Sequence, residues 1–439
     1  MNARGRNLLF AGLMLVAFAA AGYKIFKHPA ASSFAVNAAK TSPSLLASSS
    51  PVKRELQAPQ FEAQFVSGNP GQAVHASSIV ELRDGSLRAV WFSGSREGSG
   101  DVTIQTAVMN PSTGQWGPEV TLFNRPQLQR SLQRYIKKIG NPVIARAPDG
   151  SLHLWMVNVS LGGWAGSAIT WSQSQDDGAS WSQPKRLVTS PFLNISTLGK
   201  GAPVAMANGQ ISLPVYHEFV TKFAEVLRLA QDGKVIDKVR IPASQTSLQP
   251  VVLASSAQSA QAFMRAGRGG QVMTSQTEDA GRSWSDTTSL PIPNPDSALA
   301  GVVLQNGERW LALNPTQAGR EKLALINANQ SALSVAVEPA SPQQSQAKPL
   351  SIKDHEAALG LELKAKGVSD TDIKAYVASA RKQLCGDVNC VQEFSYPFLL
   401  QSRDGMLHLV YTWNRSRIKY MRFDPSNLPT ATAKANGSN

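Results

Sequence analysis

Two arginines in this chain of 439 residues occupy positions that suit the binding of a carboxylate. Arg265 ends the apolar run that begins at Phe263, where a merely solvated charge would be poorly placed, and Arg320 follows Gly319 in a polar segment. A guanidinium group offers a planar fork that makes two parallel charged hydrogen bonds to a carboxylate, which a lysine cannot do. Because a buried arginine needs a partner, Arg265 in particular is a candidate for binding an acidic ligand.

The framework that must position such residues is indicated by an eight-residue pattern that occurs twice. The pattern is Ser or Thr, Asp, Gly and Trp at the first, third, fifth and eighth positions, and its copies are Ser174–Trp181 and Thr277–Trp284. Its Asp and its hydroxyl residue can bond nearby backbone amides, its Gly can adopt a positive φ, and its Trp can fill the layer below. These residues serve a turn between antiparallel strands, so they indicate fold and not catalysis.

A second unit recurs through the chain and consists of an apolar strand, a short polar turn and another apolar strand. In five copies the turn ends in Asp-Gly or Asn-Gly, and the sixth, from Pro250 to Arg265, has a longer polar loop instead. The turn glycines are Gly85, Gly150, Gly209, Gly307 and Gly405. Six repeats of about 45 to 65 residues, each long enough for four short strands, predict an all-β fold, a six-bladed β-propeller. The period excludes a sandwich, and helices do not alternate with the strands, which disfavours a parallel α/β sheet.

Residues 340–392 do not follow the strand pattern of the repeats around them, and they predict a small helical insertion between the fifth and sixth blades. A linker rich in Pro, Ser and Gln precedes a helix expected to end near Gly367, whose apolar positions are Ile352, Leu359, Leu361 and Leu363. A second helix is expected after Ser369, which with Asp372 resembles a capping box. The two helices form either a lid over one face of the propeller or a brace, and we favour the brace.

The termini differ in composition from the predicted propeller, residues 61–425. Residues 1–27 place basic residues on both sides of the uncharged run from Leu8 to Gly22, which predicts a signal peptide or an uncleaved membrane anchor. Residues 28–60 are rich in Ala, Ser and Pro, as expected of a tether, and 426–439 are expected to be a flexible tail. Either form of the leader predicts a periplasmic or extracellular propeller, tethered to the membrane if the leader is retained.

The chain has two cysteines, Cys385 and Cys390, which close a small loop just before the last repeat. For an exported domain they predict a disulfide. Half of a metal site is the alternative, but no Cys or His lies close enough in sequence to complete one. We therefore predict no metal site and no cofactor.

The chain is basic, with a formal charge of +13. Removing the leader removes four basic residues and no acidic ones, so the remainder carries +9. There is no nucleic-acid motif, so we expect an acidic glycan or polysaccharide as partner and no nucleic acid. Nothing in the sequence indicates the oligomeric state.

From about residue 65 to 424 the sequence resembles the sialidases (neuraminidases), which are six-bladed propellers with Asp boxes like the two patterns above. The best match runs from Phe394 through Asp404-Gly405 to Tyr411 and places the family's nucleophilic tyrosine on Tyr396. A phenol suits this role because the anomeric carbon of a sialic acid carries a carboxylate, which would repel a carboxylate nucleophile; sialidases are an exception to the scheme with two carboxylates. A core tyrosine at the start of a strand is the alternative for Tyr396.

The resemblance implies roles for four further residues. Arg265 and Arg320 match two of the three arginines that grip the substrate carboxylate. Asp101, on the glycine-rich loop that starts at Gly94, matches the acid and base, which requires a raised pKa. Arg96 matches the arginine that accompanies this Asp. For Asp101 an ordinary turn carboxylate is the alternative.

The chain departs from the sialidase pattern at two positions. The first arginine of the family is expected on the opening strand, where this chain has His75-Ala76. The Glu that activates the tyrosine is expected where Gln249 stands, and an amide cannot accept the proton. Because the reference pKa of tyrosine is about 10, Tyr396 would be a poor nucleophile without a base.

Other residues could fill these gaps. His75, His217 and Glu218 are candidates, since in some sialidase-like propellers that act on other polysaccharides a His carries the proton chemistry. Basic residues of the last repeat are candidates for the missing charge: Arg415, Arg417 and Lys419. Four tryptophans could stack on sugars, with Trp164 between glycines as the most exposed: Trp91, Trp155, Trp164 and Trp413.

These residues lead to one main hypothesis and two alternatives. The main one is an exported hydrolase that removes a terminal acidic sugar, sialic acid or a related one, from a glycan. In it Asp101 is acid and base, Tyr396 the nucleophile, and Arg265 and Arg320 the clamp. The alternatives are a propeller that binds carbohydrate at the envelope without catalysis, and a lyase or rhamnosidase that uses His217.

Overall fold

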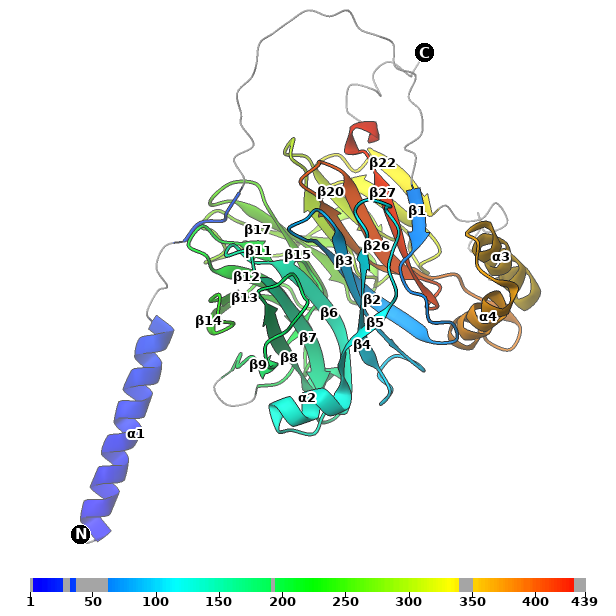
Figure 1. Ribbon diagram of the computed structural model, residues 1–439. Helices are drawn as coiled ribbons and strands as arrows, with labels where there is room; N and C mark the ends of the chain where they lie inside the picture. The colour runs from blue at the N-terminus through cyan, green and yellow to red at the C-terminus, as the bar shows by residue number, and fades with distance from the viewer. Residues whose placement is uncertain (1–2, 27–31, 37–61, 191–193, 339–349, 430–439) are drawn as a thin grey trace, which may run out of the picture. The chain divides into compact units, whose positions relative to one another are not determined.

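The computed structural model describes residues 3–26, 32–36, 62–190, 194–338 and 350–429 (Figure 1). The chain divides into two compact units, Met1–Ser32 and Ser33–Asn439. In the first unit α1 spans Ala3–Phe26. Within the described part of the chain, no helix is both long and apolar enough to cross a bilayer.

The second unit contains six antiparallel sheets arranged as the blades of a β-propeller, as the sequence predicts. The strands of each blade are given from the innermost strand outward. Blade one is β2 (Ala73–Glu81), β3 (Leu87–Gly94), β4 (Thr103–Met109) and β5 (Val120–Asn124). Blade two follows α2 (Arg125–Leu132) and is β6 (Lys138–Arg146), β7 (Leu152–Val159), β8 (Ser167–Ser174) and β9 (Lys185–Arg186). Blade three is β10 (Leu198–Gly199) with β11 (Val204–Ala205), then β12 (Ile211–His217), β13 (Phe223–Leu229) and β14 (Val235–Arg240).

The remaining three blades have the same antiparallel order. Blade four is β15 (Ser247–Ala254), β16 (Ala260–Ala266), β17 (Gly270–Thr277) and β18 (Thr288–Asn294). Blade five is β19 (Ala300–Val303), β20 (Arg309–Leu313), β21 (Leu323–Asn327) and β22 (Ser334–Glu338). Blade six is β25 (Phe394–Gln401), β26 (Leu407–Trp413), β27 (Arg417–Phe423) and β1 (Glu62–Phe65). Because β1 comes from the start of the unit and pairs with β27, it closes the ring.

The two kinds of turn lie at the same end of the blades. The five Asp-Gly and Asn-Gly turns join the first and second strands, and their glycines have φ between 82° and 86°. The two eight-residue patterns join the third and fourth strands at the same end, where Gly178 N donates to Ser174 Oγ (2.7 Å) and Ser180 N donates to Asp176 Oδ1 (2.9 Å). The loops between second and third strands therefore lie at the other end, which we call the mouth end.

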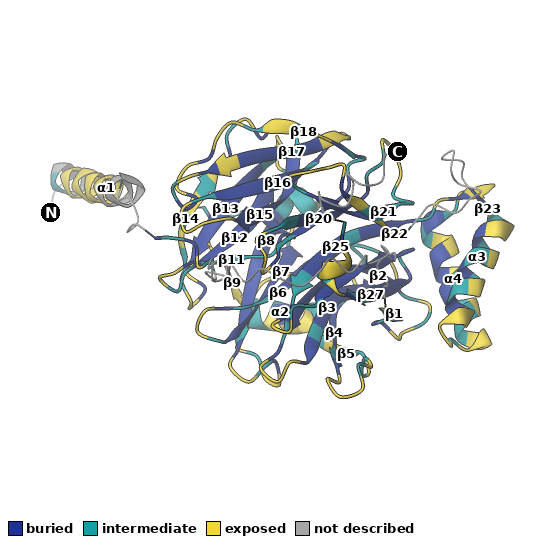
Figure 2. Cartoon of the chain, turned by 90° about the horizontal axis from the view of Figure 1, so that it is seen from above, coloured by how far each residue is buried: buried dark blue, intermediate teal, exposed yellow. Residues whose placement is uncertain are grey.

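The helical insertion lies between blades five and six in sequence and at the side of the propeller in space (Figure 2). It consists of β23 (Leu350–Ser351), α3 (Ile352–Ala365), α4 (Asp370–Leu384) and β24 (Asn389–Cys390). Ser369 caps α4 by accepting from Asp372 N, as predicted. Leu359, Leu363 and Tyr376 share one hydrophobic core with strands of blades five and six, so the helices contact the propeller as a brace would.

One predicted core position in the insertion is wrong. Leu361 is 71% exposed, whereas Leu359 and Leu363 are buried. Leu359 and Leu363 are four residues apart and lie on the same face of the helix, while a residue two positions from each points away. The apolar sequence alone does not distinguish these leucines; the helical period does.

The packing of α3 can be tested with two matched substitutions. We expect Leu363→Ala to lower the free energy of unfolding by about 2 to 5 kcal/mol, because it leaves a cavity between α3 and the propeller. Leu361→Ala removes the same atoms from an exposed site, and its effect should stay within about 0.5 kcal/mol. Urea denaturation followed by near-ultraviolet circular dichroism measures both. Equal losses in the two variants would contradict this packing.

Candidate functional site

The innermost strands share a local irregularity near the mouth end. In four of them the pairing with the second strand shifts register, and the bulged residue has a positive φ. These residues are Ala76 (φ 55°), Asn141 (φ 43°), Gln249 (φ 50°) and Tyr396 (φ 53°). In blade three the pairing with β12 is interrupted after Gly199, so Lys200 takes the corresponding place. A bulge redirects a side chain, and in this fold it brings one residue from each of five blades to the same level of the channel.

Gln249 joins the predicted nucleophile to the predicted clamp. Its Nε2 donates to Tyr396 Oη at 3.0 Å, and its Oε1 accepts from Arg265 Nη1 at 3.0 Å. Nε2 also lies 3.4 Å from Tyr216 Oη. Because Arg265 can only donate, it turns the carbonyl of Gln249 toward itself and the amide toward the phenols. Tyr396 Oη thus accepts a hydrogen bond here and finds no proton acceptor in Gln249.

Three arginines from three blades are held by acidic residues. Arg265, near the end of β16, donates from Nε to Asp296 Oδ1 at 2.5 Å. Arg320, between β20 and β21, donates from Nη2 to the Asp296 carbonyl at 3.0 Å and from Nη1 to Glu393 Oε1 at 3.2 Å. Arg415, between β26 and β27, donates from Nε to the other oxygen of Glu393 at 2.9 Å. Shared partners therefore fix all three guanidinium groups, which we call the arginine clamp.

Glu393 is the central carboxylate of this arrangement. Burial would raise its pKa, but Arg415 and Arg320 outweigh burial and hold the pKa below its usual value. Ser395 Oγ donates to the same carboxylate at 2.6 Å. Glu393 therefore stays ionised and keeps two arginines in place.

Two further cationic or titratable residues lie against Tyr396. The His75 ring is 4.2 Å from the Tyr396 ring between centroids, and its pKa is well below the usual value because of burial and of Arg415 and other cations. Lys200 Nζ donates to the Pro397 carbonyl at 2.8 Å and lies 5.8 Å from the centre of the Tyr396 ring. Burial lowers the pKa of Lys200 to about 7. His75 is therefore neutral where the family would have an arginine.

The glycine-rich loop between β3 and β4 lies at the mouth end. Its Glu97 Oε2 accepts from Arg415 Nη1 at 3.0 Å. Asp101 is exposed and accepts from Ser95 N (2.9 Å), Ser95 Oγ (3.1 Å) and Ser99 Oγ. Burial would raise the pKa of Asp101, but these hydrogen bonds outweigh it and lower the pKa. The raised pKa expected from the sequence is wrong for this state, because three donors favour the carboxylate.

Three further candidates, Arg96, His217 and Glu218, lie outside the arginine clamp. Arg96 is exposed, and its side chain makes no hydrogen bond or ion pair with the described residues. His217 stacks on Phe223 with 4.5 Å between ring centroids and has Nε2 2.9 Å from the Phe219 carbonyl. Glu218 follows β12 and is half-buried; burial raises the pKa of its carboxyl, opposed by Lys222 and Arg265. Glu218 is thus the member of this pair that is coupled to the clamp.

The aromatic and basic candidates are mostly structural. Trp91, Trp155 and Trp413 are buried, so the prediction that they could stack on sugars is wrong for them. Trp164 is half-buried, with Lys138 Nζ 5.6 Å from the ring centre. In the last repeat, Arg417 stacks between Phe65 and Tyr376, and Lys419 bonds to Glu338 and Glu362. These two basic residues connect blade six to its neighbours and to the insertion.

Sequence reasoning missed Asp296 and Glu393, which hold the clamp, and Lys200, which lies against Tyr396. Glu393 lies three residues before Tyr396, and Lys200 lies between two glycines, Gly199 and Gly201. Only the folded chain, which brings them next to Tyr396 and the arginines of other strands, distinguishes them from ordinary surface charges.

Comparisons with known proteins agree with this architecture. Residues 85–409 match the model of the BNR repeat-like domain. The chain belongs to this family. No curated protein sequence matches the chain.

The solved structures that resemble this family member include several sialidases. One is a Hadza microbial sialidase (TM-score 0.59, 14% identity). The match covers 81% of this chain and 66% of the sialidase, which is just under two thirds of the sialidase's length. Another is the intramolecular trans-sialidase from Ruminococcus gnavus in complex with oseltamivir carboxylate (TM-score 0.56, 12% identity, 83% and 96% covered). A third is the Trypanosoma rangeli sialidase (TM-score 0.55, 14% identity, 84% and 60% covered). At these identities the likeness shows the fold.

Burial of Lys200 leads to a pH dependence of stability that can be measured. Its pKa is about 7 in the folded protein against 10.5 for an ordinary lysine, so the unfolded chain binds a proton that the folded chain lacks between these values. Stability should therefore rise as the pH rises from about 7 toward 10, and the full cost is present below about pH 7. Each pKa unit corresponds to about 1.4 kcal/mol, so Lys200→Met should remove an effect on the order of 4 kcal/mol.

The measurement is the difference in unfolding free energy between Lys200→Met and the wild type at pH 7, 8 and 9. The variant should gain most at pH 7 and progressively less above it. Lys234→Met, which changes an exposed lysine, is the matched control and should give a difference that is independent of pH. A pH-independent difference for Lys200→Met would contradict the assignment.

Proposed function

We propose that the protein binds a terminal acidic sugar of a glycan in the arginine clamp and hydrolyses its glycosidic bond. The observation that supports this most is the convergence of Arg265, Arg320 and Arg415 around a tyrosine that Gln249 connects to Arg265. Three fixed guanidinium groups beside a phenol suit a sugar that carries its carboxylate next to the reacting carbon. Sialic acid and related sugars have this chemistry.

The clamp can receive a carboxylate without losing its own contacts. Nη2 of Arg265 and Nη2 of Arg415 make no hydrogen bond with the described residues. The other nitrogens of Arg265 are held by Asp296 and Gln249, and those of Arg415 by Glu393 and Glu97. Preorganised donors lose little freedom when the ligand binds. The acidic partners also keep the empty site from carrying several unbalanced charges.

In the proposed reaction Tyr396 Oη loses its proton to solvent and attacks the anomeric carbon, while Asp101 protonates the leaving oxygen. Asp101 then activates the water that releases the sugar from Tyr396, so that the same residue serves as acid and as base. Its low pKa in the empty site must rise when substrate covers the glycine-rich loop and reduces solvation. Arg265, acting through Gln249, stabilises negative charge that develops on Tyr396 Oη.

A second candidate function is carbohydrate binding without catalysis, and Gln249 is the observation that favours it. An amide that donates to Tyr396 cannot take its proton, while the clamp is complete without that step. A lyase or rhamnosidase that uses His217 is a third possibility from the sequence, and the contacts of His217 with Phe219 and Phe223 give it no support. We further propose, from the basic and apolar leader, that the protein acts in the periplasm or outside the cell.

The nucleophile can be tested by removing one oxygen atom. If the protein is a hydrolase, Tyr396→Phe should lower kcat on a fluorogenic sialoside or a related acidic glycoside by at least about 10³-fold. Tyr216→Phe removes the other phenol near Gln249 and should lower it by less than about tenfold. Binding on a glycan array should persist in both variants. Binding without turnover in the wild type, abolished by Arg265→Ala, would replace the hydrolase with the binding function.

The role of Gln249 is tested by restoring the carboxylate. Gln249→Glu provides an acceptor for the Tyr396 proton next to Arg265, so we expect kcat to increase by about tenfold or more, with an acidic limb in the pH profile from the new carboxyl. Gln261→Glu, a buried glutamine of the same blade outside the site, is the control and should leave kcat unchanged. No increase in the first variant would mean that Tyr396 does not transfer its proton to this position.

A further inference from the structure

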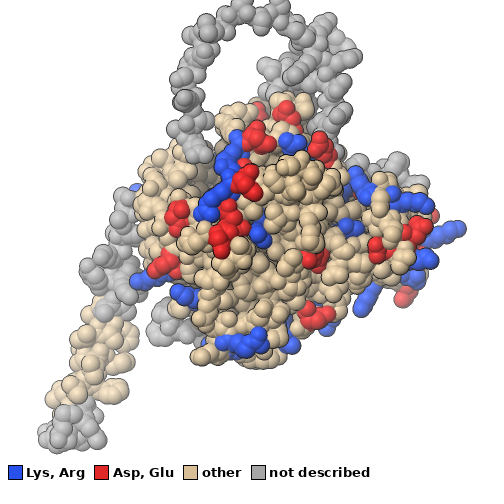
Figure 3. All heavy atoms as spheres, in the orientation of Figure 1, with Lys and Arg blue, Asp and Glu red and all other residues tan. Residues whose placement is uncertain are grey.

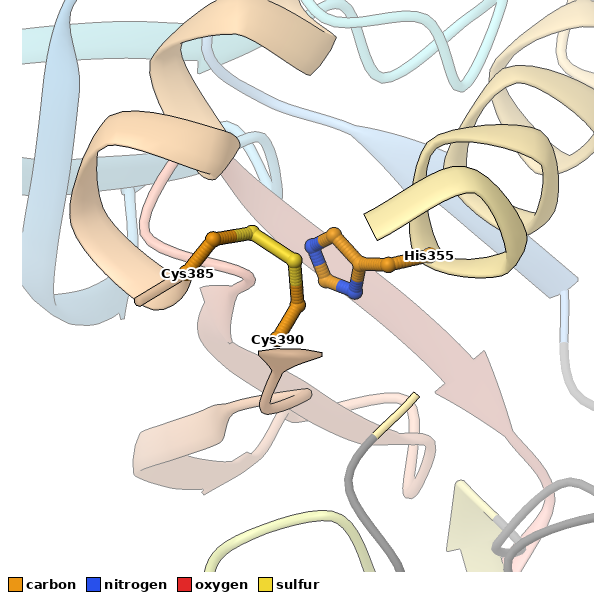
Figure 4. Close-up of side chains that lie close together, drawn as sticks. All are labelled: His355, Cys385 and Cys390. Carbon is orange, nitrogen blue, oxygen red and sulfur yellow. A yellow bond between two sulfur atoms is a disulfide. The ribbon is translucent and has the colours of Figure 1, made fainter. Parts of the chain in front are cut away.

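The helical insertion holds a cluster of three sulfur and nitrogen ligand groups outside the candidate site. His355 lies on α3, Cys385 directly follows α4, and Cys390 lies on β24 (Figure 4). The cysteines form the predicted disulfide. One ligand atom from each of the three side chains lies within 4.8 Å of the others. The fold brings His355 to the two cysteines, although it lies 30 residues before Cys385 in the sequence.

The histidine in this cluster is unusual because its polar atoms are not satisfied. His355 is fully buried, and neither Nδ1 nor Nε2 makes a hydrogen bond with any of the described residues. A buried polar group without a partner costs free energy, and such groups often mark a ligand or ion. Figure 4 shows the imidazole ring beside the two sulfur atoms. A lone pair of His355 is thus available to an ion in this cluster.

We propose that the reduced protein uses Cys385, Cys390 and His355 to bind one thiophilic divalent cation of the Zn²⁺ type. A thiol reductant first supplies two electrons and two protons, which break the sulfur–sulfur bond and give two thiols. The cation then replaces the two thiol protons, which go to solvent, and the neutral imidazole completes three ligands. Two thiolates and one imidazole form a set that zinc accepts, with a water in the fourth position.

The local structure is compatible with this exchange. With zinc–sulfur distances of about 2.3 Å, two sulfurs on one tetrahedral ion lie about 3.8 Å apart. The two sulfur atoms must therefore move apart after the disulfide is reduced. Residues 386–389 between the cysteines are exposed and can adjust.

An ion in this cluster would connect the helical insertion to blade six. Cys390 lies three residues before Glu393, which holds Arg320 and Arg415. The disulfide ties the end of α4 to this segment when the protein is oxidised, and the metal would tie the same elements when it is reduced. The insertion would therefore keep its connection to the blade six strand in either redox state.

The test is a Co²⁺ titration of the full chain, since Co²⁺ reports thiolate ligands by charge-transfer absorption in the near ultraviolet. The protein is reduced with a phosphine, freed of reductant without air and titrated. We expect one Co²⁺ per chain in the reduced protein and none in the oxidised protein, displacement by Zn²⁺, and a higher thermal midpoint of the reduced protein with Zn²⁺. His355→Ala should weaken binding by about tenfold or more, and His217→Ala, a histidine outside the cluster, should not.

Two results would overturn the proposal. One is a reduced wild type that binds no more Co²⁺ than the variant with Cys385→Ser and Cys390→Ser. The other is a His355→Ala variant with unchanged affinity, which would exclude the imidazole as a ligand. If His355→Ala fails to fold, as judged by circular dichroism, His355→Gln keeps most of the volume and gives the same comparison.

Discussion

The bulge near the start of four of the six inner strands is the constraint on which the candidate site depends. A regular strand would alternate its side chains between the two faces of its blade, so residues of different blades could not meet in the channel. With one residue at positive φ, blades four and six turn Gln249 and Tyr396 toward each other until an amide and a phenol are 3.0 Å apart. Such conformations cost free energy in residues other than Gly, and the surrounding pairing must supply it.

Charge pairing then keeps the mouth end in one arrangement. Three guanidinium groups in a confined space would repel each other, and each has an acidic partner. Glu393 is shared between two of them, so a single buried carboxylate links blades five and six. On the outer surface seen in Figure 3 basic and acidic side chains are interspersed, so the positive net charge does not form one broad patch there. Selectivity for an acidic ligand would therefore come from the clamp and not from the field of the whole protein.

The sequence predicts those parts of the molecule that depend on local chemistry. The glycine turns, the two Asp boxes and the cap at Ser369 each act within a few residues, and each is found where it was predicted. The closure of the ring by β1 was not predictable, because its partner β27 lies more than 350 residues away. For the same reason Glu393 and Asp296 were missed: their roles depend on arginines of other strands. The predicted rise in the pKa of Asp101 is wrong because this pKa depends on three donor groups of Ser95 and Ser99, whose orientation the sequence does not define.

The two departures from the sialidase pattern are easier to understand together than separately. The sialidase pattern would place an arginine near position 75 and a glutamate at 249, one positive and one negative charge. This chain has a neutral histidine and a neutral amide there, so the pair of charges is absent as a unit and the balance of the site is kept. Arg415 lies close to this position, since its backbone carbonyl accepts from Val74 N at 2.9 Å, and its guanidinium is balanced by its own partners, Glu97 and Glu393. Replacing only one member of such a pair would leave a buried charge unpaired, which is far more costly than replacing both. The same reasoning explains why Gln249 can donate to Tyr396 and still accept from Arg265, since an amide offers both functions without adding a charge.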